Sequence, residues 1–136
     1  MANPTVWVIE DNEADSELLE IAFARIGAAV DFRVVWTGDE AVALIEQGAE
    51  APTLALVDLN LPGYSGLEVL DRIRAAPRFE RTAVVMLSTT QRPEDKSAAL
   101  AAGANAFITK PVGLQDFLGV VRHISDTFLL ADPAPL

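Results

Sequence analysis

The chain contains no cysteine, and its 10 Lys and Arg residues are outnumbered by 20 Asp and Glu residues. The lack of cysteine excludes disulfides, thiolate metal sites and a cysteine nucleophile, and it fits a cytoplasmic protein. The net charge of −10 argues against binding to nucleic acid or to an anionic membrane, because both need a basic face. No apolar run approaches the roughly 18 residues of a membrane span. The N-terminus also lacks the basic start of a signal peptide.

The length and the apolar content favour one folded domain. The chain has 136 residues, of which 51% are hydrophobic, so it is long enough and apolar enough to bury a core. A second folded domain would need at least about 50 further residues.

Five short apolar segments predict β-strands. Most are continuous runs of Val, Ile and Leu and do not alternate with polar residues, which is typical of a parallel sheet covered on both faces. The predicted strands are Val6–Ile9, Val34–Trp36, Leu54–Val57, Ala83–Leu87 and Ala106–Ile108.

Between and after these strands, apolar residues recur at helical spacing, and we interpret the stripes as core-facing. Ser65 is a predicted N-cap, and Gly27 and Gly103 are predicted stops. The five predicted helices include Leu18–Ile26, Ala41–Ile45, Leu67–Ile73, Pro93–Ala102 and Phe117–Phe128.

The alternation of strands and helices predicts an α/β fold with a parallel sheet and right-handed crossovers. Five such units suit a flavodoxin-like (βα)5, doubly wound sheet with strand order 2-1-3-4-5. The order follows from the fold class and not from individual residues.

Polar side chains follow four of the predicted strands. Glu10 and Asp11 follow the first strand, Asp58 the third and Ser88 the fourth, and Lys110 lies just past the fifth. In the order 2-1-3-4-5 these four strands are neighbours. The side chains should therefore share one rim, at the carboxyl ends where such sheets bind ligands.

The chemistry of this rim points to phosphoryl transfer. Two carboxylates about 4 Å apart repel by ~1 kcal/mol in water and ~4 kcal/mol at an effective dielectric near 20, so three of them favour a bound cation. Oxygen ligands without histidine or cysteine favour Mg²⁺. Lys110 suits a phosphate oxygen and Ser88 adds a hydroxyl donor. Each residue alone would be interpreted as an ordinary surface or turn residue, and only the joint placement predicts the site.

Four motifs resemble those of response-regulator receiver domains, in the same order and with matching spacing over about the whole chain. On this resemblance residues 1–130 form a single receiver domain and residues 131–136 a C-terminal tail. The matching motifs are Glu10-Asp11, Asp58-Leu59-Asn60-Leu61-Pro62-Gly63-Tyr64-Ser65-Gly66, Ser88 and Thr109-Lys110-Pro111.

The resemblance implies a phospho-acceptor and a metal site. Asp58 would take the phosphoryl group from a phosphohistidine of a sensor histidine kinase. Asp11 and Asp58 would bind Mg²⁺ directly, Glu10 through water, and Asn60 through its backbone carbonyl. Glu10 stands where Asp is more frequent in the family. The protein would catalyse its own phosphorylation and dephosphorylation without being an enzyme that acts on other molecules.

The resemblance also implies a switch. Lys110 would pair with Asp58 and then with the phosphoryl oxygens, while Ser88 would hydrogen-bond the phosphoryl group. Phe107 occupies the position of the switch aromatic, and Asn60 and Thr90 occupy positions that tune dephosphorylation. The bond between Lys110 and Pro111 is a candidate cis peptide.

The surface of the fourth helix, fifth strand and fifth helix is the expected output face. The fourth helix, Pro93–Ala102, carries four alanines and a single large aliphatic residue, Leu100, so weak anchoring would make alternative positions accessible.

The segment Ile9–Asp15 and the run Phe128-Leu129-Leu130 resemble small stand-alone regulators that partner bacterial phytochrome kinases. The implied partners are a bacteriophytochrome-type histidine kinase and a downstream protein. The three apolar residues cannot all face one helical stripe. They either mark a homodimer contact or fold back on the core.

Three alternatives remain at this point. A haloacid-dehalogenase-like phosphatase would need Asp-x-Asp after the first strand, where this chain has Glu10-Asp11-Asn12. An FMN carrier would have its phosphate repelled by the same acidic segment. A pseudo-receiver would act only as a docking module. The sole histidine, His123, is expected to lie away from the rim.

Overall fold

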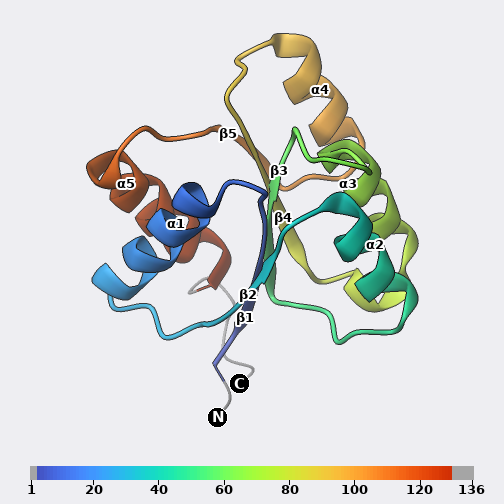
Figure 1. Ribbon diagram of the computed structural model, residues 1–136, viewed down its shortest axis with the longest axis horizontal. Coiled ribbons are helices and arrows are strands. Elements are labelled where there is room, and N and C mark those ends of the chain that lie inside the picture. Colours follow the sequence, from blue (N-terminus) through green and yellow to red (C-terminus); the bar gives the residue numbers. More distant parts are fainter. Residues whose placement is uncertain (1–2, 130–136) are drawn as a thin grey trace.

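The computed structural model describes residues 3–129, which form a five-stranded parallel sheet between two layers of helices (Figure 1). The strands are β1 (Thr5–Ile9), β2 (Asp31–Val35), β3 (Leu54–Asp58), β4 (Ala83–Ser88) and β5 (Ala106–Thr109). The helices are α1 (Glu13–Arg25), α2 (Gly38–Glu46), α3 (Gly66–Ala75), α4 (Pro93–Ala101) and α5 (Leu114–Ile124). A 3₁₀ turn (Pro77–Phe79) follows α3 and a π-helical turn (Ser125–Leu129) follows α5. The strand order β2-β1-β3-β4-β5 confirms the predicted flavodoxin-like topology.

The two faces of the sheet bury separate clusters of apolar side chains. Successive side chains of a strand point to opposite faces, so Val6 and Val8 of β1 pack with α1 and α5. Trp7 and Ile9 pack in the other cluster, with α2, α3 and α4. Figure 1 shows the same division, with α1 and α5 on one side of the sheet and the other three helices opposite. Coverage of both faces explains why the central strands are continuously apolar.

Side-chain caps fix where helices start at the carboxyl edge of the sheet. The Asn12 side chain accepts the Asp15 amide at 3.0 Å and begins α1 directly after the acidic pair. Ser65 and Glu68 form a reciprocal capping box at the start of α3, which confirms the predicted cap. Both helices therefore leave the rim within a few residues of the candidate site.

The second strand differs from its prediction. It begins three residues before the predicted Val34 and ends at Val35, so Trp36 lies outside it and is 42% exposed. The reason is that β2 is an edge strand with exposed residues at Asp31 and Arg33. A search for continuous apolar runs detects only the buried end of such a strand.

The C-terminal end of the described chain packs on its own core. The π-helical turn continues α5, and Phe128 and Leu129 are half-buried against the cluster shared by α1 and α5. This supports the folded-back alternative for these two side chains. Leu130 and the predicted tail, 131–136, lie outside the described residues.

The bond between Lys110 and Pro111, whose isomer the sequence leaves open, is trans, because the described residues contain no cis peptide bond. The trans preference before proline is only about 0.5–1 kcal/mol, which is too small for the sequence to decide the isomer. Within the described chain, no helix is both long enough and apolar enough to cross a membrane.

Candidate functional site

The sheet register brings the predicted site residues together at the carboxyl edge. Ile9 of β1 stands opposite Val57 of β3, so the next residues, Glu10 just after β1 and Asp58 at the end of β3, are neighbours at this edge. Ser88 ends β4, the strand that lies between β3 and β5. Its carbonyl accepts the backbone amide of Lys110 at 2.7 Å, which fixes the start of the loop after β5.

Three carboxylates form the predicted metal-binding cluster. Glu10, Asp11 and Asp58 each offer one oxygen, and these oxygens lie within 4.8 Å of one another. Glu10 and Asp58 are buried, whereas Asp11 is exposed and can be reached by a hydrated ion. The buried Glu10 Oε1 faces the Lys110 ammonium. A cluster made of carboxylate oxygens alone, without histidine or cysteine, fits a hard divalent cation.

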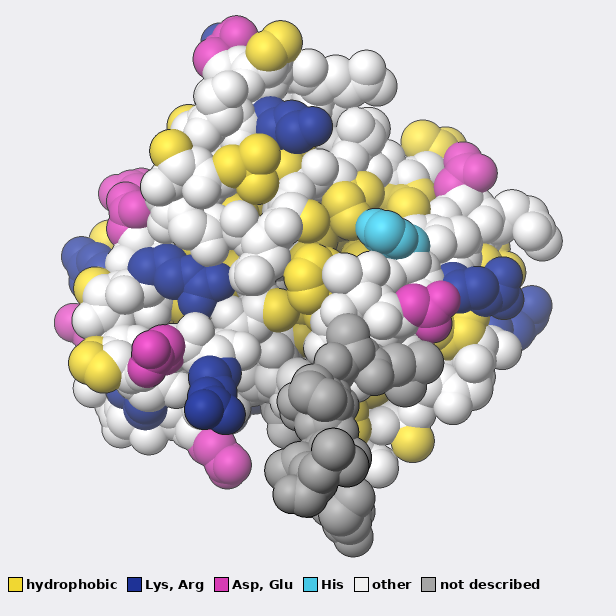
Figure 2. Space-filling view, turned by 180° about the vertical axis from the view of Figure 1, so that it is seen from behind, with side chains coloured by type: hydrophobic (Ala, Val, Ile, Leu, Met, Phe, Trp, Pro, Cys, Tyr) yellow, Lys and Arg dark blue, Asp and Glu magenta, His cyan; other side chains and the backbone are white. Residues whose placement is uncertain are grey.

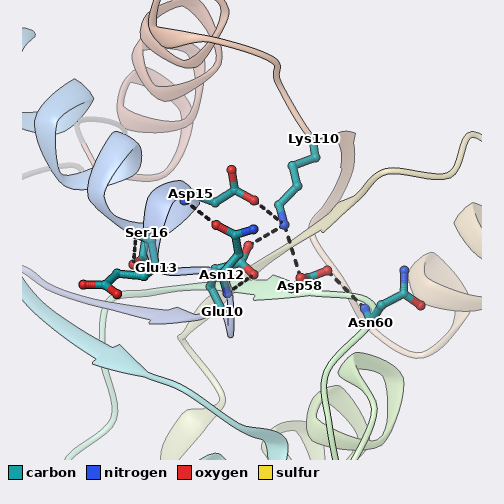
Figure 3. Close-up of polar contacts among 8 residues, drawn as sticks. All are labelled: Glu10, Asn12, Glu13, Asp15, Ser16, Asp58, Asn60 and Lys110. Atoms are coloured by element: carbon teal, nitrogen blue, oxygen red, sulfur yellow. Dashed lines mark hydrogen bonds and ion pairs between the residues drawn. The ribbon is translucent and has the colours of Figure 1, made fainter.

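Lys110 stands among the carboxylates (Figure 3). Its Nζ hydrogen-bonds Asp58 Oδ2 at 3.2 Å. The same ammonium forms ion pairs with Glu10 Oε1 at 2.6 Å and with Asp15 Oδ2 at 2.9 Å. The Lys110 side chain is only 9% exposed, so these contacts are little screened by water.

Burial and neighbouring charges shift the pKa values of Glu10 and Lys110. Burial, together with the neighbouring carboxylate of Asp58, raises the pKa of Glu10 to about 7, against the lowering effect of Lys110. Burial also lowers the pKa of the Lys110 ammonium, but the surrounding carboxylates outweigh it and raise the pKa above its usual value. Lys110 therefore stays charged. One cation faces several acidic groups, so the site retains negative charge for a further cation.

The Asp58 side chain is also fixed from the loop that follows it. Its Oδ1 accepts the backbone amide of Asn60 at 3.1 Å, while the side chain of Asn60 is exposed. One carboxylate oxygen thus faces the loop and the other faces Lys110.

Of the predicted switch residues, Ser88 ends β4 at the carboxyl edge, and Phe107 lies in β5 two residues before its end. Ser88 is fully buried, and its Oγ accepts the backbone amide of Thr90 at 3.1 Å. Phe107 of β5 is half-buried against the cluster on the α2, α3 and α4 side. His123 is exposed near the end of α5, which runs away from the carboxyl edge, so it lies away from the rim. Figure 2 shows this histidine on the surface of the molecule.

Asp15 is the residue that the sequence interpretation missed. It belongs to the first turn of α1, and its carboxylate is a direct partner of Lys110. The usable signal was its place one turn after Asp11, on a helix that starts at the rim. That signal indicates proximity but does not identify the lysine as its partner.

The chain matches the response regulator receiver domain over residues 6–122 and belongs to that family. Response regulator Rcp1 of Synechocystis is 31% identical over 135 residues, covering 94% of this chain and 92% of Rcp1. The phosphate regulon regulator PhoB of Rhizobium meliloti is 33% identical over 119 residues, or 88% of this chain. The chain spans about half of PhoB, 51% of its length.

Solved structures agree in fold. The phosphorylated cyanobacterial phytochrome response regulator RcpA has a TM-score of 0.89 at 33% identity, with 99% of this chain and 100% of RcpA covered. The Mn²⁺-bound form of Rcp1 has a TM-score of 0.85 at 29% identity, with coverage of 98% and 99%. The receiver-domain prediction is therefore confirmed in preference to the phosphatase and FMN-carrier alternatives.

Proposed function

We propose that this chain is a stand-alone response regulator that accepts a phosphoryl group on Asp58 from a histidine kinase of the phytochrome class. The observation that carries the proposal is the position of Asp58. Its carboxylate is held 3.2 Å from Lys110 and within 4.8 Å of the oxygens of Glu10 and Asp11. A carboxylate nucleophile, a fixed ammonium and a group of carboxylates that can bind a metal ion are the parts that phosphoryl transfer needs.

The transfer forms one bond and breaks one bond. A carboxylate oxygen of Asp58 attacks phosphorus, the bond from phosphorus to the kinase imidazole breaks, and the imidazole keeps the electron pair. Glu10, Asp11 and Asp58, with the carbonyl of Asn60, would hold Mg²⁺. When bound, the metal neutralises the charge on the transferring phosphoryl oxygens.

After transfer, the protein's own residues hold the product. Lys110 follows the phosphoryl oxygens because the group carries about −1.5 to −2 charges. Ser88 gives up its local contact with the Thr90 amide and donates its hydroxyl to a phosphoryl oxygen. The resemblance to the family assigns Asn60 and Thr90 to positions that tune dephosphorylation, so their identities would set the lifetime of the aspartyl phosphate.

The output face is α4, β5 and α5. Ala99 is the sole buried residue of α4, and Leu100 is 42% exposed, so few apolar contacts hold this helix in place. Movement of Ser88 draws Phe107 inward and shifts α4, which changes the face seen by a downstream protein in the cytoplasm.

A kinase panel tests the partner class. The chain should take labelled phosphate rapidly from an autophosphorylated bacteriophytochrome kinase and more slowly from the kinase of a PhoB-type system. The description of RcpA as a phytochrome response regulator supports this preference. Equal transfer rates from both kinases would remove the phytochrome assignment, and no transfer from either would count against acceptance by Asp58. The Asp58→Asn variant controls for other acceptors.

A further inference from the structure

We propose that Asp15 is a positioning residue that restrains Lys110 and so weakens the hold of the site on a phosphoryl group. The inference rests on the proposed function, because it concerns the same lysine. It assigns a role to the carboxylate in the first turn of α1.

Asp15 acts on the lysine and not on the metal-binding carboxylates. Its Oδ2 lies 2.9 Å from Lys110 Nζ, closer than the 3.2 Å between Nζ and Asp58 Oδ2. It does not belong to the group of three carboxylates whose oxygens converge. Within residues 3–129 the Asp15 carboxylate pairs with Lys110, while the backbone amide of Asp15 donates to the side chain of Asn12.

The ammonium group has three N–H donors, and three carboxylates already surround it. A phosphoryl oxygen on Asp58 can take over the donor that now faces Asp58, but a second contact with the ammonium needs a donor that now faces Glu10 or Asp15. Asp15 opposes this exchange in two ways. It competes for the ammonium, and its negative charge repels the phosphoryl group. Removal of that one charge should therefore strengthen binding of the phosphoryl group.

Replacement of Asp15 leaves Lys110 paired. Glu10 and Asp58 remain at ion-pair distance, and Asp15 itself is 23% exposed. A hollow of about 270 Å³ beside the pair is lined by Asp15, Lys110 and the loop Pro111–Gly113. Water can enter there and solvate the neutral amide of an Asp15→Asn variant, so a change in binding would not reflect an unpaired buried charge.

The test is titration of the protein with beryllofluoride, a phosphoryl analogue, at saturating Mg²⁺ in a calorimeter. The Asp15→Asn variant should bind the analogue about threefold more tightly than wild type, the effect of one partly exposed ion pair. Its aspartyl phosphate, formed with acetyl phosphate, should also be hydrolysed at a different rate. The Asp15→Glu variant, which restores the carboxylate, should return affinity toward wild type.

Glu13→Gln is the matched control. Glu13 lies in the same first turn, and its side chain points away from Lys110 (Figure 3). Glu13→Gln removes one negative charge from the first turn of α1, as Asp15→Asn does, but it should leave the affinity for the analogue unchanged. Unchanged or weaker binding by Asp15→Asn, with wild type binding normally, would overturn the role of Asp15 alone. Equal tightening by Glu13→Gln would also overturn it. Failure of wild type to bind the analogue would overturn the proposed function and this inference together.

Discussion

Glu10 shows how one buried side chain sets the chemistry of this site. It is 1% exposed, lies next to Asp58 and contacts a lysine that is itself nearly buried. The sequence predicted Glu10, Asp11, Asp58, Ser88 and Lys110 because parallel strands bring their carboxyl ends to one edge. It could not predict the ion pair of Asp15, because the direction taken by a long lysine side chain depends on the competition among several carboxylates.

The raised pKa of Glu10 predicts a pH-dependent stability. The folded protein keeps a proton on Glu10 between the ordinary pKa of 4.5 and about 7, where the unfolded chain has lost it. Unfolded chains thus bind fewer protons, and the contribution of Glu10 to the free energy of unfolding falls as pH rises through this window. The fall is at most about 3 kcal/mol.

Urea unfolding of wild type and Glu10→Gln at pH 5, 6, 7 and 8, in a chelator, measures this contribution. The free energy of unfolding of wild type minus that of the variant should fall from pH 5 to pH 7 and level off at pH 8. A difference that does not change with pH, or that rises, would contradict the assignment.

Among the elements, the turn from β3 into α3 and the helix α4 differ in how closely they are packed. The turn is tightly packed: a Cβ added to Gly66 would lie 2.3 Å from the carbonyl oxygen of Asp58. By contrast, α4 buries Ala99 alone. Hydrophobic runs predicted the central strands well because both sheet faces are covered. They missed most of β2 because an edge strand need not be apolar.

Gly66→Ala should destabilise the protein by about 1–3 kcal/mol and displace Asp58, because backbone at 2.3 Å cannot yield as a flexible side chain can. Gly119→Ala in α5 is the control. Nothing lies within 4 Å of its added Cβ, so this change should stabilise by about 0.5–1 kcal/mol through helix propensity. Thermal and urea unfolding measure both. Equal effects in the two variants would show that the close approach at Gly66 is tolerated.

Hydrogen exchange should locate the mobile element. Beryllofluoride with Mg²⁺ should change amide exchange in α4 and β5 more than in α2, because α4 is held by few buried side chains. The Asp58→Asn variant should show no change on the same addition. Bound analogue without any change in α4 would remove this helix from the switch.

At the scale of the whole molecule, the net charge of −10 is concentrated in part at one rim. Glu10, Asp11, Asp15 and Asp58 meet there, and Lys110 offsets one charge. Cation binding should therefore stabilise the folded state, since the unfolded chain does not hold these carboxylates together.

Magnesium should raise the melting temperature of wild type. At ten times the dissociation constant the stabilisation is about 1.4 kcal/mol. The double variant Glu10→Gln/Asp11→Asn should lose the effect, and NaCl of equal ionic strength should not reproduce it. If the double variant responds as wild type does, the ion binds elsewhere.

Phosphorylation by a small donor tests the central claim most directly. The protein is incubated with Mg²⁺ and acetyl phosphate and its intact mass is measured. Wild type should gain one phosphoryl group that is released by mild base, and Asp58→Asn should gain none. Equal modification of Asp58→Asn, or no modification of wild type, would contradict the account and favour a receiver that acts only as a docking module.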